Sequence, residues 1–563
     1  MKSTDKIKKI IYNVKNVVKE RKFKYISFFW IIIAIQFVIG NNLQNKGHSI
    51  RNMTDFIISL VQVIGLSLIF IVIHYCTLEI YKKIKKRLNK EKINANIENK
   101  NENSEKKWFI YFFIIIICWI PTLLAFYPGL VNYDGGYQIR DYFFDNKINL
   151  GHPIVTTFFY TIFYEIGFYY LNSPALGMLM FSIFQMTIMA LIFSYAVKFI
   201  EEETGKKCLR NISILIYGLF PYNQLFTIMT TKDVIFAGLV TIFIINLYKM
   251  LKGKYKIVDY IFFIIITILM LLFRSNAVYA LIVLLPFAFL MLINNKKKFR
   301  NLLVVAIISI IICQGINRLV VSIVNDKSGE NIIWLCVFAQ ATGKITKERE
   351  NDLTDYERKK ISLYFTNYKE VGKIYKTYIA DYTMKLAKYD NILENRKEFF
   401  TFMLELAKKY PREFMDSYLN TMRGYWYVLD NSFCLIHNDY DSDKFGALEL
   451  FCFKVGKGQY EIVENSKLPA LQKLYKDMFC RNMYQKIYGV RIIFQPATYL
   501  YILFGCILYS IYKRHKTRLL IEMFLLLYAM TFVTAPCALI RYVYPIIVNI
   551  PIIFSLLKIE ERK

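Results

Sequence analysis

About thirteen segments of this chain run for roughly 16 to 24 residues with almost no charged side chain, the length that an α-helix needs to cross ~30 Å of hydrocarbon. A helix of a water-soluble protein shows an apolar stripe and not a wholly apolar surface. Hydrophobic residues make up 55% of the chain, and its mean hydropathy is +0.32. We therefore expect an all-α, polytopic membrane protein. The expected spans are residues 24–40, 56–75, 108–127, 154–171, 174–197, 211–229, 234–250, 258–273, 276–293, 301–323, 492–512, 519–535 and 538–557.

One long polar stretch, residues 324–490, separates the last three of these spans from the others. Its segments, such as "EFFTFMLELAKKYPREFMDSYLNTMRGYW", carry apolar residues at helical spacing, which predicts an inserted, mostly helical domain. The remaining predicted parts are an N-terminal addition of two spans with a basic loop (1–107), a transmembrane core with a first outer loop at 128–153 (108–323), and the C-terminal transmembrane helices (491–563).

Lysine and arginine clusters predict which side of the membrane each loop faces, because short cytoplasmic loops are enriched in these residues. The lysine-rich N-terminus, "KKIKKR" after residue 81, "KKKFR" at 296–300 and "KRHKTR" at 513–518 are therefore expected in the cytoplasm. This predicts a multi-pass protein of the cell membrane with cytoplasmic termini. The polar domain and the short turns at 230–233, 274–276 and 534–536 should then lie outside.

Segment 154–171 breaks the alternation of sides if it crosses the membrane. The loop before it must lie outside and the loop at 198–210 must lie inside, which leaves room for one crossing between them. The segment is short and carries Glu165 at its middle. We expect it to lie in or dip into the outer leaflet, which leaves about twelve transmembrane helices.

The formal charge of +30 would suit a nucleic-acid partner if the basic residues formed one patch. They lie instead in short loops between apolar segments, so no nucleic-acid partner is predicted. The ten cysteines show no metal-binding spacing, and the sequence predicts no metal site, no cofactor and no particular oligomeric state. Four cysteines of the polar domain could form up to two disulfides, with the pairing open: Cys336, Cys434, Cys452 and Cys480.

Four polar motifs fall at the predicted outer face: the loop at 128–153, "TTKDVIF", "FRSNA" and "LIRYVYP". Only the cytoplasmic clusters were used to assign sides, so this agreement is independent of the motifs. A charged residue at the apolar boundary is costly and usually faces a cavity or a partner. Arginine binds phosphate through paired hydrogen bonds, and a carboxylate can act as a general base. The motifs therefore predict a site for a phosphate next to a hydroxyl. The candidate residues are Asp134 and Asp233 for catalysis, and Gln138, His152, Lys232, Arg274, Asn276, Arg541 and Tyr542 for substrate binding.

Five of these candidates also have a purely structural interpretation. Asp134 could be an ordinary loop acid, although Gly135 and Gly136 predict a tight turn that presents it at the mouth of a cavity. Asp233 could complement a helix dipole, and His152 could simply precede a helix that starts at Pro153. Lys232 and Arg274 could reach out to lipid headgroups.

Several motifs together resemble the GT-C superfamily of multi-span glycosyltransferases, which use polyprenyl-phosphate sugars, and a bacterial family of uncharacterised membrane proteins related to them. The resemblance covers residues about 108 to 557. It is carried by "CWIPTLLAFYPGLVNYDGGYQ", "GHPIVTT", "TTKDVIF", "FRSNA", "YPREFMDSYLNTMRGYW" and "RYVYP".

The resemblance implies a role for four of these residues. Asp134 matches the acid of the first outer loop, which acts as catalytic base or metal ligand, and Asp233 matches a second acid. Arg274 and Arg541 match positions near the lipid-linked phosphate. The paired acids common in that loop are missing, because glycines follow Asp134, so the sequence gives no support for a divalent metal and leaves metal dependence open.

The implied function is transfer of a sugar from a polyprenyl-phosphate carrier, held among membrane lipids, to an extracytoplasmic acceptor. That acceptor could be a cell-wall polymer, a glycolipid or a protein. The alternatives are a transporter or flippase of lipid-linked saccharides, a polymerase of such saccharides, and a non-catalytic scaffold in which the four motifs do not converge.

Overall fold

The computed structural model describes residues 21–92, 104–148, 150–253, 255–324, 333–431 and 461–559, together with Val455. All regular elements within these ranges are helices, and only isolated β-bridges occur beside them. Cys434 and Cys452, and with them two of the four cysteines considered for disulfides, lie outside the described residues. The expectation of an all-α fold is confirmed for the part of the chain that the structure covers.

Eight stretches are long and apolar enough to cross a membrane, and two shorter apolar helices accompany them, α11 (Ile257–Phe273) and α12 (Asn276–Leu292). This pattern is that of a multi-pass membrane protein. The eight stretches lie in α2 (Arg21–Lys46), α3 (Met53–Lys92), α4 (Ser104–Ala125), α7 (Pro174–Thr204), α10 (Lys232–Lys252), α13 (Lys296–Val324), α25 (Lys516–Met530) with the turn after it, and α26 (Ile540–Ile547) with α27 (Ile550–Ile559).

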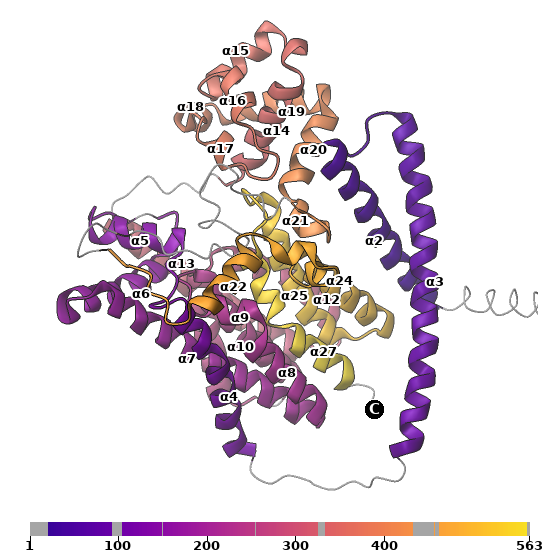
Figure 1. Cartoon of the computed structure of the whole chain (residues 1–563), viewed down its shortest axis with the longest axis vertical. Helices are drawn as coiled ribbons and strands as arrows, with labels where there is room; N and C mark the ends of the chain where they lie inside the picture. The colour runs from indigo at the N-terminus through magenta and orange to yellow at the C-terminus, as the bar shows by residue number, and fades with distance from the viewer. Residues whose placement is uncertain are drawn as a thin grey trace, which may run out of the picture.

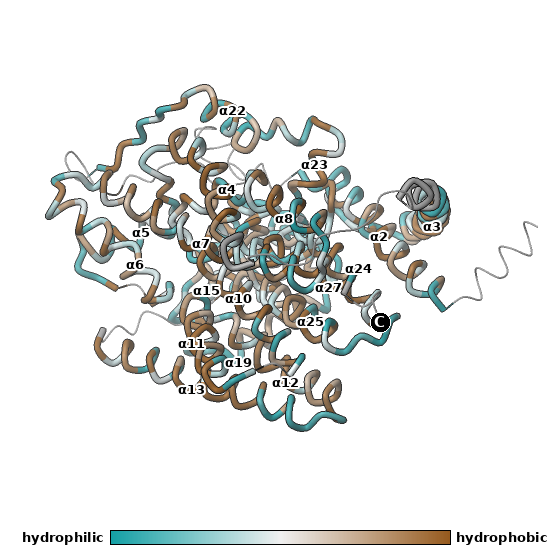
Figure 2. Tube along the Cα trace, turned by 90° about the horizontal axis from the view of Figure 1, so that it is seen from below, coloured by the Kyte–Doolittle hydropathy of each residue, from teal (hydrophilic) through white to brown (hydrophobic). Residues whose placement is uncertain are grey.

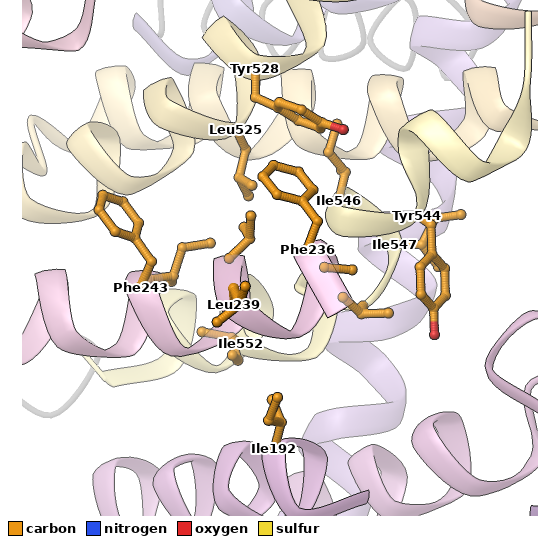
Figure 3. Close-up of a cluster of buried hydrophobic side chains, with 14 of the residues drawn as sticks. Ile192, Phe236, Leu239, Phe243, Leu525, Tyr528, Tyr544, Ile546, Ile547 and Ile552 are labelled. Carbon is orange, nitrogen blue, oxygen red and sulfur yellow. The ribbon is translucent and has the colours of Figure 1, made fainter. Parts of the chain in front are cut away.

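Helix α10 lies at the centre of the bundle, whereas α3 stands at its margin beside α2 (Figures 1 and 2). Of the apolar window of α10, 89% is buried, against 11% for α3. Phe236 and Phe243 of α10 pack against Tyr528 and Phe524 of α25 with ring centroids 5.1 and 4.6 Å apart. Figure 3 shows this cluster with side chains from α7, α10, α25, α26 and α27. A helix that is apolar on all sides is stable in such a position because neighbouring helices replace lipid around it.

The span expected at 211–229 is wrong as a continuous helix. Helix α8 (Lys207–Leu219) ends before Pro221, and a short helix α9 (Pro221–Phe226) follows. Proline removes a backbone donor and clashes with the preceding turn, so it interrupts the helix. Two side-chain amides then satisfy carbonyl groups near the break: Asn223 donates to the carbonyl oxygen of Ile216 (2.9 Å), and Gln224 donates to that of Gly218 (3.1 Å).

After α9 the chain runs without helix through residues 227–231 inside the bundle. Non-helical backbone at membrane depth requires partners within the protein, because lipid offers none. Gln185 of α7 provides them: its amide nitrogen lies 3.0 Å from the carbonyl oxygen of Thr227 and 2.9 Å from that of Met229. This interruption ends at Thr231, directly before α10 begins.

Seven further helices share a hydrophobic cluster that is distinct from that of the bundle, and we call them the α14–α20 unit. Figure 1 shows it at one end of the molecule, next to the tip of the α2–α3 hairpin. Ser49 at that tip donates to Asp416 through its hydroxyl at 2.5 Å. The helices are α14 (Leu335–Glu348), α15 (Asp355–Tyr364), α16 (Tyr368–Ile374), α17 (Asp381–Met384), α18 (Tyr389–Glu394), α19 (Arg396–Lys409) and α20 (Pro411–Thr421).

Residues 154–171 are not among the eight stretches. They form α6 (Ile154–Glu165) and a π-helical extension (Ile166–Tyr170), which folds back against the start of α7. Gly167 and Gly177 make this fold possible, because a β-carbon on Gly167 would lie 2.6 Å from the Cα of Gly177. Figure 1 shows α6 lying crosswise to the long α3.

The chain returns to the bundle from the α14–α20 unit through α21 (Arg423–Trp426), α22 (Pro469–Phe479), α23 (Val490–Ile493) and α24 (Pro496–Lys513). Arg423 and Asp430 form a buried ion pair with a nitrogen–oxygen distance of 2.6 Å. Gln36 of α2 accepts a hydrogen bond from the backbone of Val428. Helix α2 is thereby joined to the segment that follows the α14–α20 unit.

Candidate functional site

The start of the loop at 128–153 is fixed by backbone pairing to the interruption before α10. The N–H of Leu130 donates to the carbonyl oxygen of Ile228, and the N–H of Thr230 donates to that of Leu130, both at 2.9 Å. The N–H of Asn132 then donates to the hydroxyl of Thr230 at 2.9 Å. This pairing aligns two segments side by side. They are about 100 residues apart in the chain, which is the length of a small domain.

Asp134 lies in the first turn of helix α5 (Tyr133–Phe143), and the side chain of Asn132 caps that turn by accepting from the N–H of Asp134. The expectation of a tight glycine turn after Asp134 is wrong, since Gly135 and Gly136 are both helical. Gly135 is instead required by close packing: a β-carbon at this position would lie 2.3 Å from the hydroxyl oxygen of Thr230. Glycine thus allows α5 to pack directly on the segment that leads into α10.

Lys232 and Asp233 begin α10, and Asp233 is fully buried. The hydroxyl of Thr231 donates to the Asp233 carboxylate at 3.2 Å, and the guanidinium of Arg274 forms an ion pair with it. Arg274 comes from the break between α11 and α12. A carboxylate with no exposed surface is stable only when it is paired in this way.

Arg541, in the first turn of α26, joins the two acids. Its guanidinium lies 2.9 Å from Asp134 Oδ2 and 3.9 Å from Asp233 Oδ2. Burial acts to raise the pKa of Asp134, but the charges of Arg541 and Lys232 outweigh it and hold this pKa well below its usual range. Asp134 is therefore ionised at neutral pH.

Aromatic rings enclose the guanidinium of Arg274. Its central carbon lies 4.5 Å from the ring centroid of Tyr542, 5.8 Å from that of Tyr528 and 5.9 Å from that of Phe236. Arginine stacks on aromatic faces through cation–π attraction. The side chain is only 7% exposed and is paired with Asp233. These contacts exclude the interpretation that Arg274 merely reaches out to lipid headgroups.

Lys232 and His152 approach each other at the rim of the cluster, with Lys232 Nζ 3.4 Å from His152 Nδ1. Burial lowers the pKa of His152, and the charges of Lys232 and Arg541 lower it further against the opposing effect of Asp134. The imidazole is therefore mostly neutral at pH 7 and can accept a hydrogen bond from the lysine. His152 thus belongs to the cluster and does more than precede α6.

Gln138 and Asn276 occupy different positions from the other candidates. The amide oxygen of Gln138 accepts from the hydroxyls of Thr156 and Thr157 at 2.8 and 2.9 Å, and its nitrogen donates to the carbonyl oxygen of Asp134. These contacts join α5 to α6, so Gln138 holds the turn that carries Asp134 against α6. Asn276 is half-buried at the start of α12, two residues after Arg274.

Two residues near the cluster were not identified from the sequence. Tyr160 of α6 is 1% exposed, its hydroxyl has no hydrogen-bond partner among the described residues, and the charges of Asp134 and Arg541 act on it. The charges of Asp134 and Arg541 also act on the pKa of Asp381 in the α14–α20 unit. A tyrosine in an aromatic-rich helix and a single acid in a polar domain carry no sequence pattern that distinguishes them.

The assembled cluster contains two carboxylates and three cations, contributed by four segments: the start of α5, the start of α10, the α11–α12 break and the start of α26. Within the described residues, no group of three or more His, Cys, Asp and Glu side chains is arranged to hold a metal ion. The excess of cations, with arginines among them, suits an anion such as phosphate.

Comparisons with known proteins give a family and no function. No curated protein and no solved structure matches the chain. A family model matches residues 144–563, and this range contains His152, Lys232, Asp233, Arg274 and Arg541 and begins ten residues after Asp134. Because the match covers most of the chain, the protein belongs to DUF6020, a family of unknown function.

Proposed function

We propose that this protein is a membrane glycosyltransferase of the GT-C type that moves a sugar from a polyprenyl-phosphate carrier to an acceptor outside the membrane. The acceptor would be a cell-wall polymer, a glycolipid or a protein. One observation supports this proposal above the others: Asp134, Asp233, Arg274 and Arg541, which are far apart in the chain, form a single network of ion pairs. A non-catalytic scaffold gives no reason for them to converge.

The charge balance of the network favours a phosphate-bearing substrate. Lys232, Arg274 and Arg541 outnumber Asp134 and Asp233, and most of these side chains are shielded from water. Electrostatic attraction is stronger where water is excluded, and fixed cations stabilise charge that develops on a leaving phosphate. The aromatic rings around Arg274 would also suit the apolar side of a lipid-linked donor.

In the reaction that we propose, an acceptor hydroxyl oxygen attacks the anomeric carbon of the donor sugar. The bond between that carbon and the phosphate oxygen breaks, and the polyprenyl phosphate leaves with the bonding electrons. Asp134 takes the hydroxyl proton. The donor phosphate would compete with Asp134 for Arg541, so binding of the donor would free the carboxylate and raise its basicity.

We further propose about twelve crossings, with both termini in the cytoplasm and the α14–α20 unit as part of an extracytoplasmic domain. The four crossings beyond the eight long stretches would be α11, α12, α24 and the broken pair α8–α9. Contacts at the two ends of the bundle support this assignment. Ser49 joins the α2–α3 tip to the α14–α20 unit, whereas Glu201 near the end of α7 pairs with Arg210 at the start of α8, beside a turn expected to be cytoplasmic.

The proposal is tested with purified protein in proteoliposomes and polyprenyl-phosphate donors that carry radiolabelled hexoses. Alkyl glycosides serve as acceptors, and the products are separated by chromatography. Release of polyprenyl phosphate with formation of a labelled glycoside supports a transferase. Donor that crosses the bilayer without cleavage would identify a flippase, growth of a chain on the lipid carrier would identify a polymerase, and no change with any donor would contradict the proposal.

A further inference from the structure

The α14–α20 unit is fixed by backbone contacts to the segment that leads into α26. Ile379 and Cys537 form an antiparallel bridge, and the N–H of Ala380 donates to the carbonyl oxygen of Pro536 at 2.8 Å. Arg541 follows on the same segment, at the start of α26. Backbone pairing sets the position of a chain more firmly than contacts between long side chains do, because it leaves few torsions free.

A second contact supports the same segment from the other side. The N–H of Leu539 donates to the hydroxyl of Tyr425 at 2.9 Å, and the ring of Tyr425 lies 5.4 Å from that of Phe532. Tyr425 lies in α21, directly after the unit. The segment just before Arg541 is therefore contacted both by the α14–α20 unit and by α21.

This arrangement brings Asp381, the first residue of α17, within electrostatic range of the Asp134–Arg541 pair. Asp381 directly follows the bonded residue Ala380, and its side chain is exposed. The structure gives its carboxylate no ion pair or hydrogen bond within the described residues. Asp134, by contrast, is already paired with Arg541.

The groups around Asp381 come from the end of α17 itself and from four other elements. Partial burial of the carboxyl group raises the pKa of Asp381; Lys385 and Arg541 lower it, and Asp134 raises it. Its own charge acts in turn on Cys336 of α14 and on Tyr389 of α18. An exposed carboxylate is accessible to a ligand, and the hydrogen bonds that it accepts are stronger than those between neutral groups.

We infer that α17 forms the outer wall of the candidate site and that the Asp381 carboxylate accepts a hydrogen bond from a hydroxyl of the acceptor, a saccharide or another polyol. This assignment rests on the proposed function and adds the acceptor subsite to it. The donor phosphate is bound by cations of the membrane bundle, and the acceptor is bound by the polar region. Asp381 is thus a residue that binds the acceptor.

The first test compares Asp381→Asn with Asp390→Asn, an exposed acid of α18 in the same unit. In the proteoliposome assay, Asp381→Asn should raise the KM for alkyl glycosides roughly ten- to hundredfold, the loss expected for a hydrogen bond to a charged group. Binding of polyprenyl phosphate should not change, and Asp390→Asn should behave like the parent. An active parent whose Asp381→Asn variant keeps its KM overturns the inference alone; a parent without transferase activity overturns the proposed function.

The second test measures the position of α17 without any activity. Paired residues of an antiparallel bridge have their Cα atoms about 4.5 to 5.5 Å apart, within the range for a disulfide. Ile379→Cys should therefore form a disulfide with the native Cys537 under mild oxidation, detected by mass spectrometry of the linked peptides. Ile379→Cys combined with Cys537→Ser is the control. Failure to form the link in the folded protein would overturn the placement of Asp381 and with it the inference.

Discussion

Arg541 Nη1 lies 2.9 Å from Asp134 Oδ2, although the two residues are 407 positions apart in the chain. The same guanidinium approaches Asp233, which is paired with Arg274. The last apolar helix pair thereby supplies the counterion for an acid of α5. Each of the following predictions depends on a contact of this network or on the segments that hold it.

Asp134→Asn keeps the shape of the side chain but cannot accept a proton. If Asp134 is the general base, transfer in proteoliposomes should fall roughly 10²- to 10⁴-fold, the usual contribution of proton transfer. Asp141→Asn, on the same helix, is paired with Arg140 at the surface and should keep most activity. Equal rates for Asp134→Asn and the parent, at equal protein levels, would exclude this role.

Arg541→Lys and Arg274→Lys retain a positive charge but lose the planar fork of arginine. Donor use should weaken in both variants, because paired hydrogen bonds to phosphate are lost, and at Arg274 the stacking on Tyr542 is lost as well. The KM for the polyprenyl-phosphate donor measures this effect. Arg140→Lys on the outer face of α5 is the matched control; full donor use by the first two variants would contradict phosphate binding by the arginines.

Gly135→Ala should destabilise the protein by about 1 to 3 kcal/mol, the cost of overpacking. The added methyl group would meet both the hydroxyl and the carbonyl oxygen of Thr230, so α5 must move away from the start of α10. Thermal unfolding in detergent measures the loss. Gly65→Ala in α3 meets no atom within 4 Å and should be neutral or gain about 0.5 to 1 kcal/mol; similar losses in both variants would contradict the packing argument.

The acid stability of the protein should depend on His152. Its pKa in the folded state lies below the ordinary value of 6.5, so below about pH 6.5 the unfolded chain binds more protons than the folded one. Stability should therefore fall as the pH drops from 7.5 to 5.5. His152→Gln should make that fall smaller, measured as the difference in unfolding temperature between the two pH values. An unchanged difference would show that His152 is not buried among cations.

Labelling should establish the sidedness. In a cysteine-free protein, Lys359→Cys in α15 should react with a membrane-impermeant maleimide added from outside, since this position is exposed and the α14–α20 unit is expected there. Lys297→Cys, in the basic first turn of α13, should react only after the membrane is opened. The reverse pattern would place the charge cluster on the cytoplasmic face and contradict an extracytoplasmic acceptor.

Apolar length predicted most of the helices but not where they break. Hydropathy cannot distinguish a continuous span at 211–229 from a helix interrupted at Pro221, because the break is stabilised by side-chain amides of Asn223 and Gln224. These residues look like ordinary polar residues in the sequence. The break matters for the site, since it creates the non-helical segment that pairs with Leu130.

The charged candidates of the site were predictable because charge is rare at an apolar boundary. Sidedness alone placed Asp134, Lys232, Arg274 and Arg541 on one face, and the structure brings them together. Gln138 was assigned to substrate although its amide is occupied by two threonines. Asp381 was missed because acids are common in a polar region. Only the pairing of Ala380 with Pro536, which the sequence does not reveal, brings it near Arg541.

The distance along the chain between Asp134 and Arg541 also sets an order of events during synthesis. A ribosome that adds about 5 to 20 residues per second reaches Arg541 roughly 20 to 80 s after it has passed Asp134. Until then Asp134 lacks the ion pair that it has in the finished protein, with Lys232, which is made earlier, as a nearby cation. The final setting of Asp134 is therefore completed only when the last helices are inserted.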